Sequence, residues 1–340
     1  KMKTFTQQDL GEPYDPTTDA PDHVKLYAVR RHWPQGMVPY PAAVAAGFID
    51  VQPDRFEWGV WAFGQHLEGW LVDRGVIPRT GDLALDFRAI DALGARLYAT
   101  EGGGDLAPIA WGIDTGNETQ VLYDKVSGRR WLQGTKGANR QSAPPFALTQ
   151  VKLRDERGRP ILGRKISLGL IGNFDLKSAV YRGLAALVAG RREDGTFAPG
   201  TLHLPEWIDE GYVRQLVAEV LIDPQAEAKG KAKRALLERP GDHREWRKLP
   251  GRANEALDIV VGCLALVWHH GAGRITAARW RELIAEAHAA PKNALQDLFD
   301  TPALDAPEPP PAAPQAPPPR PTSAPPPGGY HIGDTQGWFR

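Results

Sequence analysis

Two stretches of the chain each lead an apolar segment into a single aspartate. They read Gly47-Phe-Ile-Asp50-Val and Trp111-Gly-Ile-Asp114-Thr. An ionised carboxylate at the end of a buried strand costs free energy unless something compensates its charge. If the two strands lie side by side, the carboxylates come together, and like charges at that distance need a cation between them. The pattern therefore predicts a cation site where two neighbouring strands end.

A third aspartate, Asp258, lies in a segment that is apolar almost all round, and we expect residues 255–269 to form a helix. A lone carboxylate there would be costly or would take up a proton. Three aspartates offer only oxygen ligands, which suit Mg²⁺ or Mn²⁺. Two such ions, about 3.5–4 Å apart, activate a water and stabilise the leaving oxygen of a phosphodiester. Glu118 and Glu255 are reserve ligands, and Glu255 shares a helix face with Asp258.

A structural role for each carboxylate stays open, because an aspartate at a strand end more commonly caps a turn or a helix. We assign Asp73 and Asp86 to surface or turn roles of this kind. Other chemistries lack their motifs: the sequence contains no His-Glu-x-x-His, no Gly-x-Ser-x-Gly and no phosphate-binding loop, so we expect no ATPase activity from this chain. The single cysteine, Cys263, excludes a disulfide framework and a Cys-rich zinc site.

Basic residues are clustered although the formal net charge is zero, with 41 Lys+Arg and 41 Asp+Glu. A uniformly basic nucleic-acid-binding protein is therefore excluded. A solvated face is the default interpretation of any one cluster, but together they bracket the carboxylates and suit a channel for the backbone of double-stranded DNA. The three clusters are Arg129, Arg130, Lys136 and Arg140; then Lys152, Arg154, Arg157, Arg159, Arg164 and Lys165; then Lys229, Lys231, Lys233, Arg234 and Arg239, continuing to Arg244, Arg247 and Lys248.

The elements that must position these residues alternate between strands and helices. Residues 42–50, 56–64 and 69–77 predict three strands in a meander, joined by turns at residues 53–54 and 65–66. Further strands are expected at residues 106–114, on both sides of the turn at residues 155–160, and at 201–204. Helices are expected at residues 82–98, 117–126, 176–189, 207–221, 255–269 and 276–289. The alternation predicts an α/β fold with a mixed sheet flanked by helices.

The two ends of the chain differ from this body, which we place at residues 41–300. Residues 1–40 are rich in turn formers and predict an irregular lead-in. Of the 31 prolines, 13 lie in residues 301–328, which predicts a Pro-rich, disordered and extended C-terminal linker. Residues 329–340 hold Tyr330, Trp338 and Phe339, which favours a docking peptide over a frayed terminus. No apolar run approaches the roughly 18 residues of a membrane span, and the start lacks a signal-peptide pattern, so we expect a soluble intracellular protein.

Several motifs match one known family in combination. They are Phe5-Thr-Gln-Gln-Asp-Leu-Gly-Glu-Pro-Tyr14, Val44-Ala-Ala-Gly-Phe-Ile-Asp50-Val-Gln52-Pro-Asp-Arg-Phe-Glu57, Trp70-Leu-Val-Asp-Arg-Gly-Val-Ile77, Gly112-Ile-Asp114-Thr-Gly116 with Val121-Leu-Tyr123-Asp124, Thr135-Lys136-Gly137, and Arg252-Ala-Asn254-Glu255-Ala-Leu-Asp258. On these residues the chain resembles the C-terminal nuclease part of the lambda-type large terminase subunit of tailed phages. The aromatic C-terminus also looks like the end of that family.

The resemblance implies an RNase H-like fold, with a five-stranded mixed sheet flanked by helices and an acidic cluster of Asp50, Asp114 and Asp258 that binds two Mg²⁺ or Mn²⁺ ions. Lys136 matches the Lys-Gly of the family and would neutralise the scissile phosphate. The implied reaction is the cutting of concatemeric viral DNA in the host cytoplasm during packaging. The implied partners are the small terminase subunit and, through the C-terminal tail, the procapsid portal. The packaging ATPase of the family has no counterpart in these residues, so we expect a separate nuclease part.

The alternative is a non-catalytic docking module, in which an RNase H-like body is a scaffold and the Pro-rich tail tethers it to the portal. Asp258 discriminates between the two interpretations. A scaffold has no need of a carboxylate in an apolar helix, so its replacement by leucine would then stabilise the protein.

Overall fold

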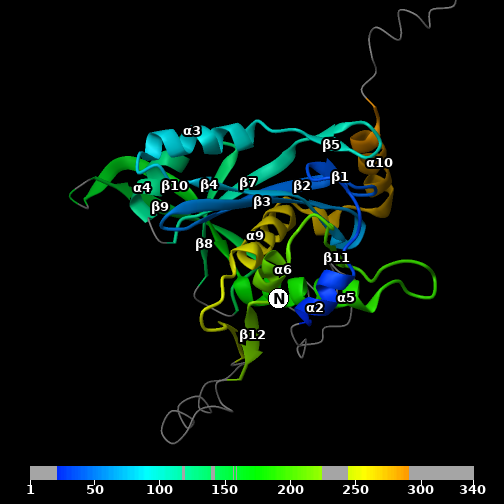
Figure 1. The fold of residues 1–340 in the computed structure, drawn as a ribbon. Coiled ribbons are helices and arrows are strands. Elements are labelled where there is room, and N and C mark those ends of the chain that lie inside the picture. The colour runs from blue at the N-terminus through cyan, green and yellow to red at the C-terminus, as the bar shows by residue number, and fades with distance from the viewer. Residues whose placement is uncertain are drawn as a thin grey trace, which may run out of the picture. The chain divides into compact units, whose positions relative to one another are not determined.

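The computed structural model describes residues 21–116, 119–138, 142–155, 157, 159–223 and 244–290 (Figure 1). Several of the sequence predictions lie outside these residues. They are residues 1–20 of the lead-in, the linker and docking peptide after residue 300, Glu118, Arg140, and the lysines and arginines of the third basic cluster between residues 229 and 239.

The fold is organised around an eight-stranded sheet with the order β11-β4-β3-β2-β7-β8-β10-β9. Its strands are β2 (Val44–Val51), β3 (Arg55–Phe63), β4 (Gly69–Pro78), β7 (Pro108–Asp114), β8 (Leu132–Gly137), β9 (Phe146–Arg154), β10 (Pro160–Ile171) and β11 (Leu202–His203). β2, β3 and β4 are antiparallel, which confirms the predicted meander. β2, β7, β8 and β10 are parallel to one another, and β9 closes the edge in an antiparallel hairpin with β10.

The helices are α2 (His23–Ala28), α3 (Leu83–Gly94), α4 (Thr119–Val126), α5 (Asn173–Ala189), α6 (Glu210–Leu216), α9 (Glu255–His269) and α10 (Ala277–His288), with 3₁₀ turns at Gln65–Leu67 and Ala272–Arg274. Short strands β1 (Met37–Val38), β5 (Tyr98–Thr100) and β6 (Asp105–Leu106) form a small sheet, and β12 (Glu219–Ile222) pairs with β13 (Glu245–Lys248). A mixed sheet flanked by helices confirms the predicted RNase H-like architecture. The sheet is larger than the five strands that the resemblance implied, because β10, β9 and β11 extend β4-β3-β2-β7-β8 at its two edges.

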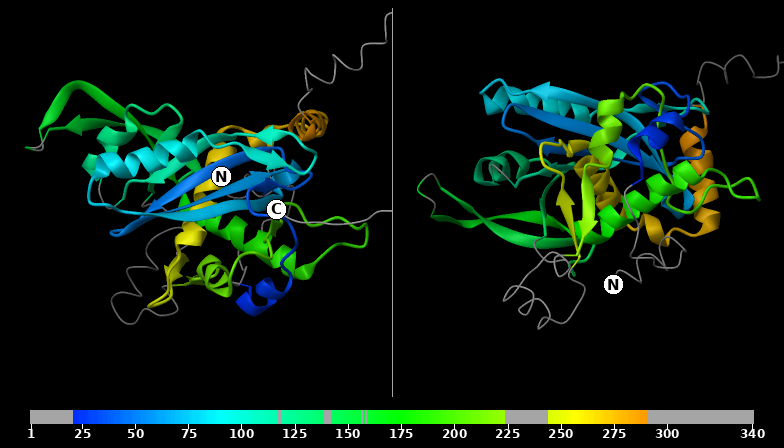
Figure 2. Two further views of the ribbon diagram at one scale, coloured as in Figure 1. Left: turned by 45° about the horizontal axis from the view of Figure 1, so that its top comes forward. Right: turned by 60° about the horizontal axis from the view of Figure 1, so that its bottom comes forward.

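The two faces of the sheet carry separate hydrophobic layers. One layer unites α5, α6 and α9 with strand residues such as Phe48, and the other includes residues of α3 and α4 with strand residues such as Ile49. Figure 1 shows α3 above the sheet and α9, α5 and α6 below it, and Figure 2 shows the same layers from two further directions. Because side chains alternate along a strand, Phe48 and Asp50 share the face that α9 covers, here called the α9 face.

Helix α9 occupies its predicted range and is buried along most of its length between β2, β3, α5 and α6. It lies close to β2 at Gly262, where an added Cβ would come 2.1 Å from the ring of Phe48. A side chain at this position would push the helix off the sheet, so the glycine sets the distance between α9 and β2. The first turn of α9, which carries Asp258, is thereby held over the end of β2.

Several local predictions were wrong. The helix predicted at residues 207–221 ends with α6 at Leu216, because the apolar stretch that follows pairs as β12 with β13. The lead-in is not irregular throughout: Asp22 caps α2, whose Leu26 is fully buried, and β1 pairs with β5. No strand was predicted at residues 132–137, where β8 lies. Asp73 is buried, and its Oδ2 lies 3.0 Å from Nη1 of Arg96, so it forms an internal ion pair.

Asp86 is also buried, and it accepts hydrogen bonds from the backbone and the hydroxyl of Thr80, in keeping with its predicted turn role. Within the described residues, no helix is both long and apolar enough to cross a bilayer.

Candidate active site

Asp50 and Asp114 stand at the same level on adjacent strands. β2 and β7 are parallel, and their register pairs Ile49 with Ile113, so the aspartate that follows each isoleucine reaches the same edge of the sheet. Alternation along both strands puts the two carboxylates on the α9 face. The structure thus places side by side the two strands that sequence reasoning expected to be neighbours.

A pocket of about 220 Å³ opens at this edge. It is formed by the ends of β2, β7, β8 and β10 together with the first turns of α5 and α9. The pocket brings Asp50, Asp114 and Asp258 together from three separate elements. Its full lining is Phe48, Asp50, Asp114, Thr135, Gly137, Ile171, Asn173, Lys177, Asp258 and Val261.

The charge of Asp50 is poorly compensated. Its side chain is only 5% exposed, and burial, followed by the negative charge of Asp258, raises the pKa of Asp50 to about 7. The hydrogen bond from the Gln52 amide opposes this rise, whereas Asp114 and Glu255 add to it. Burial likewise raises the pKa of Asp114, against the backbone N–H of Gly116, which donates to Asp114 Oδ1 at 3.0 Å. The neighbouring carboxylates therefore make Asp50 harder to ionise.

Asp258 lines the pocket, and its side chain is therefore 37% exposed although protein surrounds it on its other sides. Burial raises the pKa of Asp258, and the ammonium group of Lys177, 3.4 Å from Oδ1, works in the opposite direction. Asn254 Nδ2 donates a hydrogen bond to Asp258 Oδ2 at 2.8 Å and so fixes the orientation of the carboxylate. An orienting amide and a lysine are thus built around this one aspartate.

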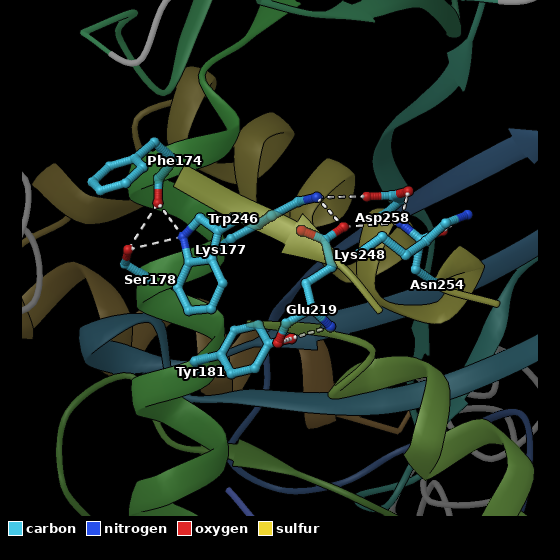
Figure 3. Close-up of polar contacts among 9 residues, drawn as sticks. All are labelled: Phe174, Lys177, Ser178, Tyr181, Glu219, Trp246, Lys248, Asn254 and Asp258. Carbon is cyan, nitrogen blue, oxygen red and sulfur yellow. Dashed lines mark hydrogen bonds and ion pairs between the residues drawn. The ribbon is translucent and has the colours of Figure 1, made fainter. Parts of the chain in front are cut away.

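Lys177 is the residue of the site that sequence reasoning missed. Its Nζ lies 2.5 Å from Glu219 Oε1, and Asn254 Nδ2 donates to the same oxygen at 3.0 Å (Figure 3). Burial lowers the pKa of Lys177, but the charges of Asp258 and Glu219 outweigh burial and raise it. The Tyr181 hydroxyl locks the backbone of Glu219 by donating to its carbonyl and accepting from its N–H. The available signal was a lone lysine among the apolar residues of the predicted helix at residues 176–189.

The donor set of the pocket fits a hard divalent cation, because three carboxylates supply oxygen ligands and lack enough positive charge nearby. Thr135 and Asn173 add neutral oxygens to the lining. Among the residues that the structure describes, no three His, Cys, Asp or Glu side chains already converge closely enough to enclose an ion. The carboxylates line the pocket without closing on one another.

Other predicted site residues have different surroundings. Lys136 is absent from the pocket lining, where its strand neighbours Thr135 and Gly137 appear, and alternation points it to the opposite face. Its charge nevertheless lowers the pKa of Asp114. Glu255 is buried with its Oε1 3.6 Å from Nη2 of Arg55, so this reserve ligand is turned toward an arginine.

Of the predicted DNA-binding residues in the described chain, Arg129 is not a free cation. Its Nε and Nη2 lie 2.6 and 2.7 Å from the two oxygens of Asp91, and its guanidinium lies over Phe87 on α3. This bidentate pair connects the end of α4 to α3, and the DNA contact of Arg129 stays a prediction. Arg130 is exposed.

The comparisons with known proteins identify the family of the chain. The family model described as "Terminase large subunit gpA, endonuclease domain" matches residues 1–280. The chain is 26% identical over 289 residues to the large terminase subunit of Escherichia phage lambda, an alignment that covers 83% of this chain and 40% of the relative. It is 28% identical over 291 residues to the large terminase subunit of Enterobacteria phage P21, covering 82% and 40%. The chain therefore spans about two fifths of the length of these relatives.

Proposed function

The chain belongs to the family of terminase large-subunit gpA endonuclease domains, and we propose that it is a metal-dependent endonuclease that cuts concatemeric viral DNA during genome packaging. One observation carries the proposal: Asp50, Asp114 and Asp258, which are far apart in the sequence, line one pocket. An enzyme that cuts phosphodiesters must accept the negatively charged DNA backbone at its site. Acidic residues can do so when their oxygen atoms bind a cation.

Asp50, Asp114 and Asp258 would hold two Mg²⁺ or Mn²⁺ ions. When bound, the ions would supply water activation and stabilisation of the leaving oxygen. The protein's own residues prepare the site for them. Asn254 orients Asp258, and Lys177 offsets part of the negative charge from the α5 side. The closely packed α9 keeps Asp258 opposite Asp50.

The proposed substrate is double-stranded DNA, and the proposed partners are the small terminase subunit and the procapsid portal, the latter through residues 329–340. Cleavage should show little sequence preference, because the sequence has no recognisable helix-turn-helix or zinc module to recognise base edges. We place the reaction in the host cytoplasm, where packaging of concatemers takes place.

The test is plasmid cleavage in Mn²⁺ or Mg²⁺ by three near-isosteric variants, Asp50→Asn, Asp114→Asn and Asp258→Asn. Each should abolish cleavage while circular dichroism shows an intact fold. The matched control is Asp54→Asn, which changes an aspartate that is 72% exposed, directly before β3. A variant that keeps near-wild-type activity would remove its residue from the ligand set, and full activity in all three would refute the proposal.

The docking-module alternative makes a different prediction for one position. Under that alternative Asp258→Leu would stabilise the protein and leave its function unchanged. Under the endonuclease proposal the same variant loses cleavage, whatever happens to its stability, because an oxygen ligand is gone. Cleavage assays on the leucine variant therefore separate the two functions.

A further inference from the structure

The hairpin of β9 and β10 extends one edge of the sheet and projects from the rest of the fold (Figures 1 and 2). Residues 150–166 hold six basic and two acidic residues, a net charge of +4 in a chain whose formal net charge is zero. Near its end the side chain of Leu162 is 100% exposed.

Two lysines stand directly opposite each other in this hairpin. The register pairs Lys165 of β10 with Lys152 of β9, and both are exposed. Neither lysine has an anionic partner among the described residues. Like charges directly opposite each other in a cross-strand pair destabilise the hairpin. A polyanion that lies across the pair would attract both ammonium groups and offset their mutual repulsion.

The lysine pair lies on the same face of the sheet as the acidic pocket. Ile171 lines the pocket, and the β9–β10 register is unbroken from Ile171 back to Lys165, so alternation puts both on the α9 face. The six intervening steps of this regular stretch correspond to about 20 Å, at roughly 3.3 Å per residue. One turn of B-DNA is about 34–36 Å long. A duplex with one phosphate in the pocket therefore passes over the hairpin within about one helical turn.

We propose that the α9 face of the β9–β10 hairpin, centred on Lys152 and Lys165, binds the phosphate backbone of the duplex whose scissile phosphate enters the acidic pocket. The inference rests on the proposed endonuclease function, because it takes DNA as the substrate of that pocket. The lysines position the duplex and give no sequence preference, since phosphate contacts carry none.

The test measures the affinity of the full chain for a fluorescent 30-base-pair duplex in EDTA over a series of salt concentrations. The variant Lys152→Gln with Lys165→Gln should make the negative slope of log K against log[salt] less steep by about 1.8, at roughly 0.9 per phosphate contact. The matched control, Arg88→Gln with Arg281→Gln, removes two exposed charges elsewhere: Arg88 lies on α3, which covers the other face of the sheet, and Arg281 lies on α10. Its slope should equal that of the wild type.

The outcomes separate this inference from the proposed function. If the wild-type chain binds duplex with a strong salt dependence and the lysine variant has the same slope, the hairpin inference is overturned and the endonuclease proposal stands. The inference also fails if the lysine variant binds normally but self-associates in sedimentation experiments, because the lysines then protect an edge strand from pairing. If the wild-type chain binds no duplex at low salt, the endonuclease proposal itself fails.

Discussion

Replacing Asp50 by asparagine should make the metal-free protein more stable at about pH 8. The Asp50 side chain is 5% exposed, and its pKa is about 7 in the folded protein against 3.8 ordinarily. Between these pH values the unfolded chain releases the proton and the folded protein keeps it, so stability falls as the pH rises. About three pKa units at about 1.4 kcal/mol each give a loss of about 4 kcal/mol above pH 7. Asparagine carries no charge at any pH and escapes this loss.

The assay is urea denaturation in EDTA of the wild type, Asp50→Asn and the control Asp54→Asn. At about pH 4 the folded wild type holds the proton of Asp50, and the unfolded chain, with the ordinary pKa of 3.8, has released only a little more than half of it, so the variant gains little. At about pH 8 its free energy of unfolding should exceed that of the wild type by up to about 4 kcal/mol. Asp54 is 72% exposed, so the control should follow the wild type. Mn²⁺ at a hundred times its dissociation constant should add about 2.7 kcal/mol to the wild type and much less to Asp50→Asn.

One result would refute this reasoning directly. If the difference between Asp50→Asn and the wild type does not change between about pH 4 and about pH 8, then Asp50 does not carry an uncompensated charge. A site whose carboxylates are already balanced by the protein has no electrostatic need of a cation, and the metal part of the proposed function would lose its physical basis.

Three further predictions concern the surroundings of the site and the C-terminal end. Lys177→Met should destabilise the protein by about 3–5 kcal/mol in urea denaturation, because it leaves the buried carboxylate of Glu219 without its cation. Adding Glu219→Gln should restore most of the lost stability. If Lys177 lacks this role, the second substitution will restore none of it. Gly262→Ala should lower stability by about 1–3 kcal/mol and weaken cleavage, because its Cβ meets Phe48, whereas Gly128→Ala, with open space around the position, should do neither. Deleting residues 329–340 should leave cleavage of free DNA unchanged and remove portal binding; unchanged portal affinity would contradict the docking role.

The sequence predicted the central part of the fold because its strands and helices carry strong patterns. β2 is a continuous apolar run, as a central strand buried on both faces must be, and α9 is apolar all round because it lies between the sheet and other helices. These patterns placed Asp50 and Asp258 on their elements, and the family resemblance implied that Asp50, Asp114 and Asp258 form one cluster. Strand β8 escaped prediction because its residues Leu132–Gly137 include two glycines, a glutamine and a lysine, which only the flanking parallel strands hold extended.

The charge network beyond the aspartates could not be predicted, because it depends on contacts between distant segments. Lys177 and Glu219 are 42 residues apart, and they meet because the start of β12 lies beside α5, where the Tyr181 hydroxyl bonds to the backbone of Glu219. Arg129 is a second example of a pairing that the sequence did not show. Its neighbours in the sequence are basic, which favoured a DNA contact, but Asp91 on α3, 38 residues away, takes its guanidinium. A charge cluster in the sequence thus does not show which of its members already have a partner.

The charges in the pocket also bear on how many ions the proposed site would hold. Three acidic residues and one basic residue line it, which leaves a formal charge of −2 when all are ionised. One divalent ion would cancel that charge and leave nothing to attract a phosphodiester. A second ion would bring the pocket to +2, which matches the charge of about −2 that develops when a hydroxide adds to a phosphodiester. Removing Lys177 would lower this balance by one charge, so Lys177 belongs to the electrostatics of the proposed site as well as to the stability of the fold.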